Sequence, residues 1–249
     1  MRHSLKEKLS QGKNILGTWC ELPSPEVVNV LSKAGLDFII IDMEHGSMDF
    51  ERAGQMVMAA QAERCCPLVR VSRNDESDIL RALEIGPSGI LVPHISSVVD
   101  RENVVRYAKF APIGNRSFNP FTRAGGYGVQ PFDLNKQNNE TLTAVMIEDK
   151  NGIVDLKEII SDDGVDMVYI GAYDLSVALG VSGDTNNKKV LTELENMVKI
   201  IRAAGKSAGC MFHSEHELEF YKNIGVQFLC YKVDTSVIFD EFLKIKKLV

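Results

Sequence analysis

Short apolar segments alternate with longer amphipathic segments along the whole chain of 249 residues. Buried parallel strands are continuously apolar, whereas a surface helix repeats its apolar residues every three or four positions. The apolar segments therefore predict eight strands, at residues 15–20, 38–41, 68–71, 89–92, 142–147, 167–170, 207–211 and 228–231. Eight strands that are each followed by a helix indicate an α/β fold, the (β/α)8 TIM barrel.

The amphipathic segments predict the helices of this barrel. A doubly wound open sheet would alternate in the same way, but it usually carries a glycine-rich phosphate loop, and neither common form of that motif is found. No linker-like break divides the chain, so we expect one domain over residues 1–249 that ends in an extended C-terminal helix. The expected helices are residues 5–11, 25–34, 50–62, 76–85, 98–108, 151–160, 175–179, 190–204, 215–224 and 236–248.

One long segment, residues 112–140, is expected to be irregular. It contains several glycines and two prolines, and a loop of this length in a compact domain is usually functional or disordered. Disordered segments are seldom rich in aromatic residues. We therefore interpret it as a substrate-side loop or a subunit contact in preference to a disordered insert, on account of Arg116, Phe118, Phe121, Arg123 and Tyr127.

The composition excludes several classes of partner. The formal net charge is -6, and the one dense basic cluster, residues 244–247, is expected to complement the end of the last helix. Nucleic acid and membrane surfaces are therefore not expected partners. The five cysteines form no C-x-x-C pair, which favours reduced thiols and a cytoplasmic location over disulfides or a zinc site. We expect neither a signal peptide nor a transmembrane segment.

The stretch FIIIDMEHG, residues 38–46, places three ionisable side chains directly after a predicted strand. Active sites of such barrels lie at the carboxyl ends of the strands. His45 is a candidate general base, and Asp42 could fix its tautomer and raise its basicity. The alternative is a solvated turn in which Asp42 caps the following residues. Glu44 is interpreted as a supporting residue that acts through a bound water or Arg70.

Two further strands end in a basic side chain. Arg70 closes the third strand, where it could clamp a substrate carboxylate or form a salt bridge with a neighbour such as Glu44. His94 follows the fourth strand and is a weaker candidate for the mouth of the barrel.

Two carboxylates follow the fifth and sixth strands. Glu148 and Asp174 could supply half of the ligands of a hard divalent cation such as Mg²⁺ or Mn²⁺, which prefers oxygen donors. The alternative is that Glu148 begins a helix and Asp174 caps the next one. The spacing alone leaves both interpretations open.

Several motifs, taken together and in order, resemble the HpcH/HpaI aldolase family, the class II metal-dependent pyruvate aldolases that include 2,4-dihydroxyhept-2-ene-1,7-dioate aldolase-like proteins. The resemblance covers nearly the whole chain. It rests on LGTW (16–19), FIIIDMEHG (38–46), VRV (69–71), GILVP (89–93), MIEDKNGIVDLKEI (146–159) and VDMVYIGAYDLSVALG (165–180).

The resemblance implies an enzyme, an aldehyde-lyase that cleaves a 4-hydroxy-2-oxo acid to pyruvate and an aldehyde through a metal-stabilised pyruvate enolate. It assigns a divalent cation (Mg²⁺, Mn²⁺ or Co²⁺) to Glu148 and Asp174, the pyruvyl group to Arg70, and acid–base catalysis to His45, assisted by Asp42. It also implies a homo-oligomer, a hexamer or trimer, in which C-terminal helices are exchanged and active sites lie near interfaces.

The chain departs from the family pattern at positions expected near the aldehyde. Ala172 and Tyr173 stand where the family motif reads Pro and a variable residue, and the irregular loop carries Arg123; all three are candidate substrate-binding residues beside Arg70. Other interpretations are a protein that binds a 2-oxo acid or acyl-CoA as a sensor, decarboxylase or acyl-CoA lyase, and a Schiff-base aldolase that uses Lys232 or Lys150.

Overall fold

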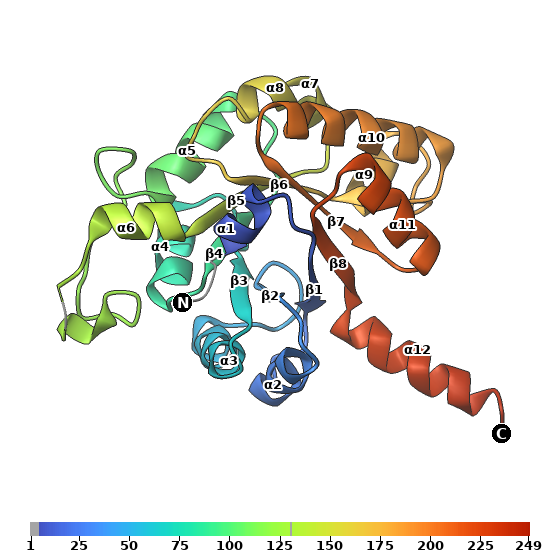
Figure 1. The fold of residues 1–249 in the computed structure, drawn as a ribbon, viewed down its shortest axis with the longest axis horizontal. Coiled ribbons are helices and arrows are strands. Elements are labelled where there is room, and N and C mark those ends of the chain that lie inside the picture. The colour runs from blue at the N-terminus through green and yellow to red at the C-terminus, as the bar shows by residue number, and fades with distance from the viewer. Residues whose placement is uncertain (1–4, 130) are drawn as a thin grey trace.

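The computed structural model describes residues 5–129 and 131–249. Eight parallel strands close into a barrel in sequence order, and β8 pairs with β1 (Figure 1). This confirms the predicted (β/α)8 barrel. The strands are β1 (Ile15–Cys20), β2 (Phe38–Asp42), β3 (Cys66–Arg70), β4 (Gly89–Val92), β5 (Leu142–Ile147), β6 (Met167–Ile170), β7 (Ser207–Phe212) and β8 (Phe228–Val233).

Helices surround the barrel, and polar side chains begin many of them. Ser24, Asp49, Asp75, Ser97 and Ser214 each accept a backbone N–H in the first turn of the helix that follows. The helices are α1 (Leu5–Ser10), α2 (Pro25–Lys33), α3 (Phe50–Ala62), α4 (Glu76–Glu84), α5 (Val98–Ala108), α6 (Leu134–Glu140), α7 (Lys150–Val154), α8 (Leu156–Ile159), α9 (Ala172–Ala178), α10 (Lys188–Ala203), α11 (Glu215–Ile224) and α12 (Asp234–Lys246).

Successive residues of each strand alternate between two apolar cores. Ile39 and Ile41 pack outward against the helices, whereas Phe38 and Ile40 belong to the cluster inside the barrel. Because the side-chain period is two, Asp42 follows Phe38 and Ile40 on the interior face of β2. The same period leads from the interior residues of β3 to Arg70 and from those of β5 to Glu148.

Aromatic rings fill the barrel interior near the amino ends of the strands. The rings of Phe38 and Phe228 stack with centroids 3.6 Å apart. Gly17 makes room for them, because a Cβ at this position would lie 2.4 Å from the ring of Phe38. The interior is therefore closed at that end, and the open end is the carboxyl end of the strands.

The segment 112–140 is more regular than its sequence predicts. A short 3₁₀ turn, η1 (Gly126–Gly128), and helix α6 lie within it, while Gln130 lies outside the described residues. The prediction of an irregular segment is wrong for α6, which begins when Asp133 accepts the N–H of Lys136. Asn138 is the one buried residue that this helix contributes, so no apolar period reveals it.

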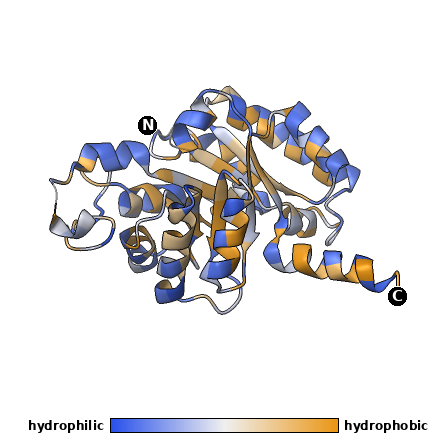
Figure 2. Ribbon diagram, turned by 60° about the horizontal axis from the view of Figure 1, so that its bottom comes forward, coloured by the Kyte–Doolittle hydropathy of each residue, from blue (hydrophilic) through white to orange (hydrophobic). Residues whose placement is uncertain are grey.

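Helix α12 extends away from the barrel at the C-terminus (Figure 1) and carries a row of apolar residues (Figure 2). This confirms the expected extended C-terminal helix. Large side chains on it are exposed to solvent, namely Ile238, Phe239, Phe242, Leu243 and Ile245. Among the described residues, no helix is both long enough and apolar enough to cross a bilayer.

Candidate active site

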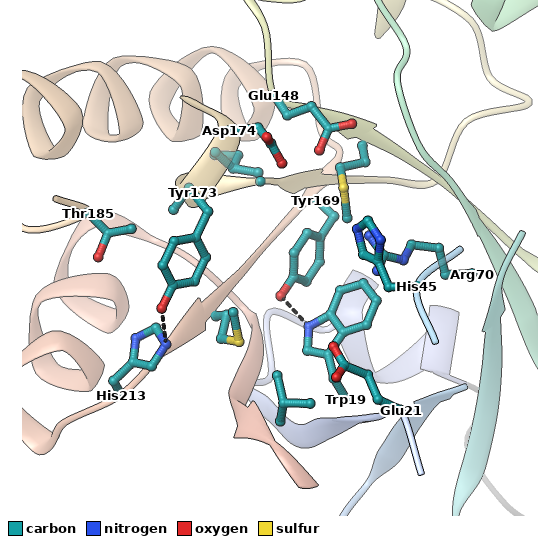
Figure 3. Close-up of a pocket in the computed structure, with 16 residues that line it drawn as sticks. Trp19, Glu21, His45, Arg70, Glu148, Tyr169, Tyr173, Asp174, Thr185 and His213 are labelled. Carbon is teal, nitrogen blue, oxygen red and sulfur yellow. Dashed lines mark hydrogen bonds between the residues drawn. The ribbon is translucent and has the colours of Figure 1, made fainter. Parts of the chain in front are cut away.

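A cavity of about 230 Å³ opens at the carboxyl ends of the strands (Figure 3). Six of the eight residues predicted to be catalytic, substrate-binding or metal-binding line it, and strands from several parts of the barrel contribute to its wall. The lining residues include Trp19, Glu21, His45, Arg70, Met146, Glu148, Tyr169, Gly171, Ala172, Tyr173, Asp174, Thr185, Met211 and His213.

Arg70 is held by two carboxylates. Asp42 and Arg70 are paired across β2 and β3, and the Asp42 carboxylate accepts from Nε of Arg70 at 2.9 Å and also from its Nη2. Nη1 lies 2.9 Å from Glu44. Burial alone would lower the pKa of Arg70, but Asp42 and Glu44 raise it, so the guanidinium stays charged. The predicted salt bridge with Glu44 is present, and only part of the guanidinium is left for a substrate.

Asp42 supports His45 by a route that differs from the predicted one. Its Oδ1 accepts the backbone N–H groups of Glu44 and His45, at 2.9 and 3.3 Å. Its described hydrogen bonds therefore fix the loop and Arg70, and none of them reaches the imidazole. The capping expected from the turn interpretation is present, and the same buried carboxylate organises the loop that places His45 in the lining of the cavity.

His94 is more closely tied to the site than its sequence suggests. Its backbone is in the left-handed region, with φ 57°. The backbone N–H donates to Oε1 of Glu148 at 2.9 Å, and the two ring nitrogens lie 2.7 Å from Glu148 and from Glu44. His94 thus joins the carboxylates that follow β2 and β5. The signal was its position directly after a strand, which many non-functional residues share.

Glu148 and Asp174 do not cap helices α7 and α9, which was the alternative to metal binding; neighbouring residues occupy the N-cap positions instead. Asp149 caps α7 by accepting the N–H of Gly152, and Gly171 occupies the N-cap of α9. Both carboxylates consequently face the cavity (Figure 3).

These two carboxylates fit a hard divalent cation. Burial raises the pKa of Glu148, nearby Asp174 and Glu44 raise it further, and His94 opposes the shift. A cation would relieve this crowding of negative charge. Gly171 keeps the space open, since a Cβ there would lie 2.8 Å from Oε2 of Glu148. The described residues contain no cluster of three or more His, Cys, Asp or Glu suited to a metal, so further ligands would be water or substrate oxygens.

An aromatic pair forms another wall of the cavity. Nε1 of Trp19 donates to the hydroxyl of Tyr169 at 2.8 Å, and the rings meet edge to face. The guanidinium of Arg70 lies 4.5 Å from the Trp19 ring centroid, a cation–π contact. Sequence reasoning assigned no role to either aromatic residue, although Trp19 lies on the interior row of β1.

A second polar group lies on the wall formed by α9 and β7. The hydroxyl of Tyr173 is 3.1 Å from Nε2 of His213, whose Nδ1 is 3.2 Å from Oε2 of Glu217. Burial opposes ionisation of Glu217, but hydrogen bonds from Asn186 and His213 lower its pKa overall. Tyr173 was predicted to bind substrate, whereas His213 and Glu217 were missed because their spacing in sequence matches no common motif.

Arg123 does not line this cavity, contrary to its predicted place beside the substrate. Its guanidinium donates to the carbonyls of Ile85 and Gly86, both at 3.2 Å, and also contacts Gln61. It lines a separate cavity with Ser88, next to the first residue of β4. The physical reason is connectivity: a loop that follows a helix returns to the amino ends of the strands, away from the site.

The lysines proposed for a Schiff base are also placed elsewhere. Nζ of Lys232 pairs with Asp240 of α12 at 2.6 Å, and this hydrogen bond raises the pKa of the lysine. Lys150 is exposed in the first turn of α7. Neither residue lines the cavity, so the geometry disfavours a Schiff-base mechanism.

Residues 16–236 match the family model of the HpcH/HpaI aldolase/citrate lyase family. The chain belongs to this family. The match includes every residue discussed at the cavity, and the HpcH/HpaI assignment agrees with the resemblance carried by the strand-end motifs. The family description and the aldolase relatives support a lyase enzyme.

Individual HpcH/HpaI relatives cover almost the entire chain. The 4-hydroxy-2-oxo-heptane-1,7-dioate aldolase of Salmonella dublin is 29% identical over 96% of this chain and 91% of its own length. The HpcH/HpaI aldolase of Desulfitobacterium hafniense DCB-2 is 28% identical, with a TM-score of 0.92 over 99% of this chain and 96% of that one. The citrate synthase SbnG is also 28% identical, with a TM-score of 0.90 over 99% and 97% of the two chains.

Proposed function

We propose that this protein is a divalent-metal-dependent aldolase that reversibly cleaves a 4-hydroxy-2-oxo acid to pyruvate and an aldehyde. The observation that carries the proposal is the convergence of His45, Arg70, Glu148 and Asp174 on one cavity at the catalytic end of the barrel. The family supports the reaction class, and the aldolase relative supports the cleavage of a hydroxy-oxo acid.

Glu148 and Asp174 would hold the cation, and Mg²⁺, Mn²⁺ and Co²⁺ all suit two carboxylates with oxygen co-ligands. When bound, a divalent cation supplies a Lewis acid that stabilises negative charge on the pyruvate enolate.

The remaining steps belong to the side chains of this chain. His45, exposed at the mouth of the cavity, would remove the proton from the 4-hydroxyl group as the bond between C3 and C4 breaks. The aldehyde then leaves, and the methylene carbon of the enolate gains a proton to give pyruvate. Arg70 would donate to the pyruvyl group through N–H groups not engaged by Asp42 and Glu44. Trp19 and Tyr169 keep water from that side.

Metal removal tests this function directly. Pyruvate release from a panel of 4-hydroxy-2-oxo acids should stop after treatment with EDTA and return when Mg²⁺ or Mn²⁺ is restored. Full activity after complete removal of metal would contradict the proposal.

The non-catalytic alternative has its own measurement. Tyr173 lines the cavity and directs its hydroxyl to His213 (Figure 3), an arrangement that leaves Asp174 at the cavity surface. We expect the protein to exchange the methyl protons of pyruvate with deuterated water in the presence of metal. Binding of metal and pyruvate without this exchange would instead favour a sensor.

We further propose a cytoplasmic homo-oligomer, a trimer or hexamer, with small molecules as its other partners. The exposed apolar face of α12, which includes Ile238, Phe239 and Phe242, supports a contact with a second copy of the chain. Cys20, Cys65, Cys210 and Cys230 are buried free thiols, in keeping with a reducing compartment.

A further inference from the structure

The wall of the cavity that carries Tyr173 has no role in binding pyruvate under the proposed function. In the close-up, Glu148 and Asp174 lie at the top and Arg70 and His45 on the right, whereas Tyr173, His213 and Thr185 lie together on the left (Figure 3). We propose that Tyr173, oriented by His213 and Glu217, selects a neutral aldehyde that carries a hydroxyl group as the acceptor. This inference rests on the proposed aldolase function and specifies its second substrate.

Hydrogen bonds of His213 determine whether the Tyr173 hydroxyl acts as a donor or an acceptor toward the cavity. Glu217 accepts the backbone N–H of His213 at 2.6 Å and lies 3.2 Å from Nδ1, so the proton of a neutral imidazole is held on Nδ1. Asn186 donates to the other carboxylate oxygen at 2.9 Å and keeps Glu217 in place.

Nε2 of His213 is then an acceptor, and the phenol of Tyr173 donates its proton to it across 3.1 Å. The lone pairs of the Tyr173 oxygen remain for the cavity. They can accept a hydrogen bond from a substrate hydroxyl, while a carboxylate, which has no proton to donate, would meet repulsion. Thr185, on the same wall, offers a second hydroxyl partner.

The charges around the cavity lead to the same selection. Among the described residues that line it, Arg70 is the single Arg or Lys, and it is already paired with Asp42 and Glu44. Glu21 adds negative charge to the lining. A second carboxylate on the acceptor would therefore find no free cation and would face acidic groups.

The acceptor proposed here differs from the one implied by the name of the Salmonella dublin relative. A 4-hydroxy-2-oxo-heptane-1,7-dioate aldolase acts on a dicarboxylate, whose cleavage yields an aldehyde with a carboxylate at its far end. The Tyr173 wall instead suits a short hydroxyaldehyde, such as glycolaldehyde, which presents a hydroxyl group beside the carbonyl.

Acceptor pairs that differ in one group provide the test. In the condensation direction, a proton leaves the pyruvate methyl group, the carbon–carbon bond forms at the aldehyde carbon, and the aldehyde oxygen gains a proton. We would measure kcat/KM for glycolaldehyde against acetaldehyde and for succinic semialdehyde against butanal. Because each ratio is taken within one variant, changes in the pyruvate half cancel.

Tyr173→Phe should lower the glycolaldehyde to acetaldehyde ratio about tenfold relative to the unsubstituted protein, as expected for one lost hydrogen bond. Tyr127→Phe removes a hydroxyl from an exposed residue that does not line the cavity, so it should leave the ratio unchanged. Butanal should be used at least as well as succinic semialdehyde.

An unchanged ratio in Tyr173→Phe, or a preference for succinic semialdehyde over butanal, would overturn the inference. Exchange of the pyruvate methyl protons, measured in the same preparations, separates this from a failure of the function. Exchange together with an unchanged ratio overturns only the acceptor assignment, whereas loss of exchange in the unsubstituted protein overturns the aldolase function and the assignment with it.

Discussion

Asp42 shows how one side chain can serve both the fold and the site. It is 0% exposed, and its charge is compensated by Arg70 on the neighbouring strand and by two backbone N–H groups. Removing one partner of a buried ion pair leaves the other charge buried and uncompensated. The resulting loss of stability is far larger than the net free energy that the intact pair contributes. Asp42 therefore fixes both Arg70 and the loop that carries His45.

At the same scale, His45 and Glu148 should separate proton transfer from metal binding. We expect His45→Ala to lower the rate of pyruvate release about 100-fold or more while Mn²⁺ affinity changes little, because the imidazole is assigned to proton transfer and not to metal binding. Glu148→Ala should abolish pyruvate release and Mn²⁺ binding together, since it removes one of the two carboxylates proposed to hold the cation. Steady-state kinetics and electron paramagnetic resonance of free Mn²⁺ measure the two quantities.

His216→Ala is the matched control, because it removes an exposed histidine from α11 that does not line the cavity. Its activity and its Mn²⁺ affinity should equal those of the unsubstituted protein. Small and equal effects of His45→Ala and Glu148→Ala would mean that the stretch after β2 is only a turn.

Lys109 gives a pH dependence that is separate from catalysis. Burial lowers its pKa to about 8, and its Nζ donates to the carbonyls of Asn138 and Thr141. The unfolded chain keeps the ordinary lysine pKa of 10.5, so it binds more protons than the folded chain between pH 8 and 10.5. In that window this residue makes the folded state more stable as pH rises, by up to about 3 kcal/mol.

Urea unfolding at several pH values measures this contribution as a difference between the unsubstituted protein and Lys109→Met. The difference is needed because buried thiols act in the opposite sense, as for Cys65, whose pKa burial raises to about 12. A difference in unfolding free energy that stays constant from pH 8 to 10.5 would contradict the assignment.

Residues with a local signal were predictable from the sequence, and residues recruited by the fold were not. Asp42, Arg70 and Glu148 follow directly from apolar strands, and the alternation of a strand fixes the side on which they lie. His213 and Glu217 reach Tyr173 only because β7 lies beside β6 in the closed barrel. Their partner is some 40 residues away in sequence, so no local pattern indicates the contact.

At the scale of elements, the junction between β6 and α9 controls the shape of the proposed metal site. Gly171 has φ -78° and ψ 84°, so alanine is tolerated by the backbone there, but its Cβ would lie 2.8 Å from Oε2 of Glu148. We expect Gly171→Ala to displace this carboxylate and to lower Mn²⁺ affinity about tenfold or more, as measured by isothermal titration calorimetry.

Gly54→Ala is the control for this substitution, because a Cβ in the middle of α3 meets only ordinary contacts at 3.7 Å. It should leave Mn²⁺ affinity unchanged and raise the unfolding free energy by about 0.5–1 kcal/mol, the usual gain in a helix interior. Unaltered Mn²⁺ affinity in Gly171→Ala would show that Glu148 does not hold the cation.

The elements also show where sequence patterns fail. The helices with a clear apolar face, such as α3 and α11, begin and end where the pattern places them. The expected helix 151–160 is instead two short helices, α7 and α8, that meet at Asp155. Polar α6 and the position of Arg123 were missed because both depend on how the loop after α5 folds back on the barrel.

At the scale of the whole molecule, α12 carries a group of large apolar side chains that a single chain does not bury. Phe239 is 65% exposed and Phe242 is 74% exposed. We expect Phe239→Asp together with Phe242→Asp to shift the protein from an oligomer to a monomer in analytical ultracentrifugation, because both charges would have to enter an apolar contact. Glu241→Ala changes an exposed polar residue on the same helix and should leave the mass unaltered. A monomer without any substitution would contradict the proposed contact.

The first turn of α12 is also bound to the rim of the cavity. The carboxylate of Asp234 accepts the backbone N–H groups of Glu21 and Leu22, both at 3.1 Å, and Glu21 lines the site. In the proposed homo-oligomer, a copy of the chain that covers α12 would therefore restrain the same backbone that shapes the pocket. Turnover per molecule should then decrease when the protein is diluted below the dissociation constant of the assembly, so that its cellular concentration sets its specific activity.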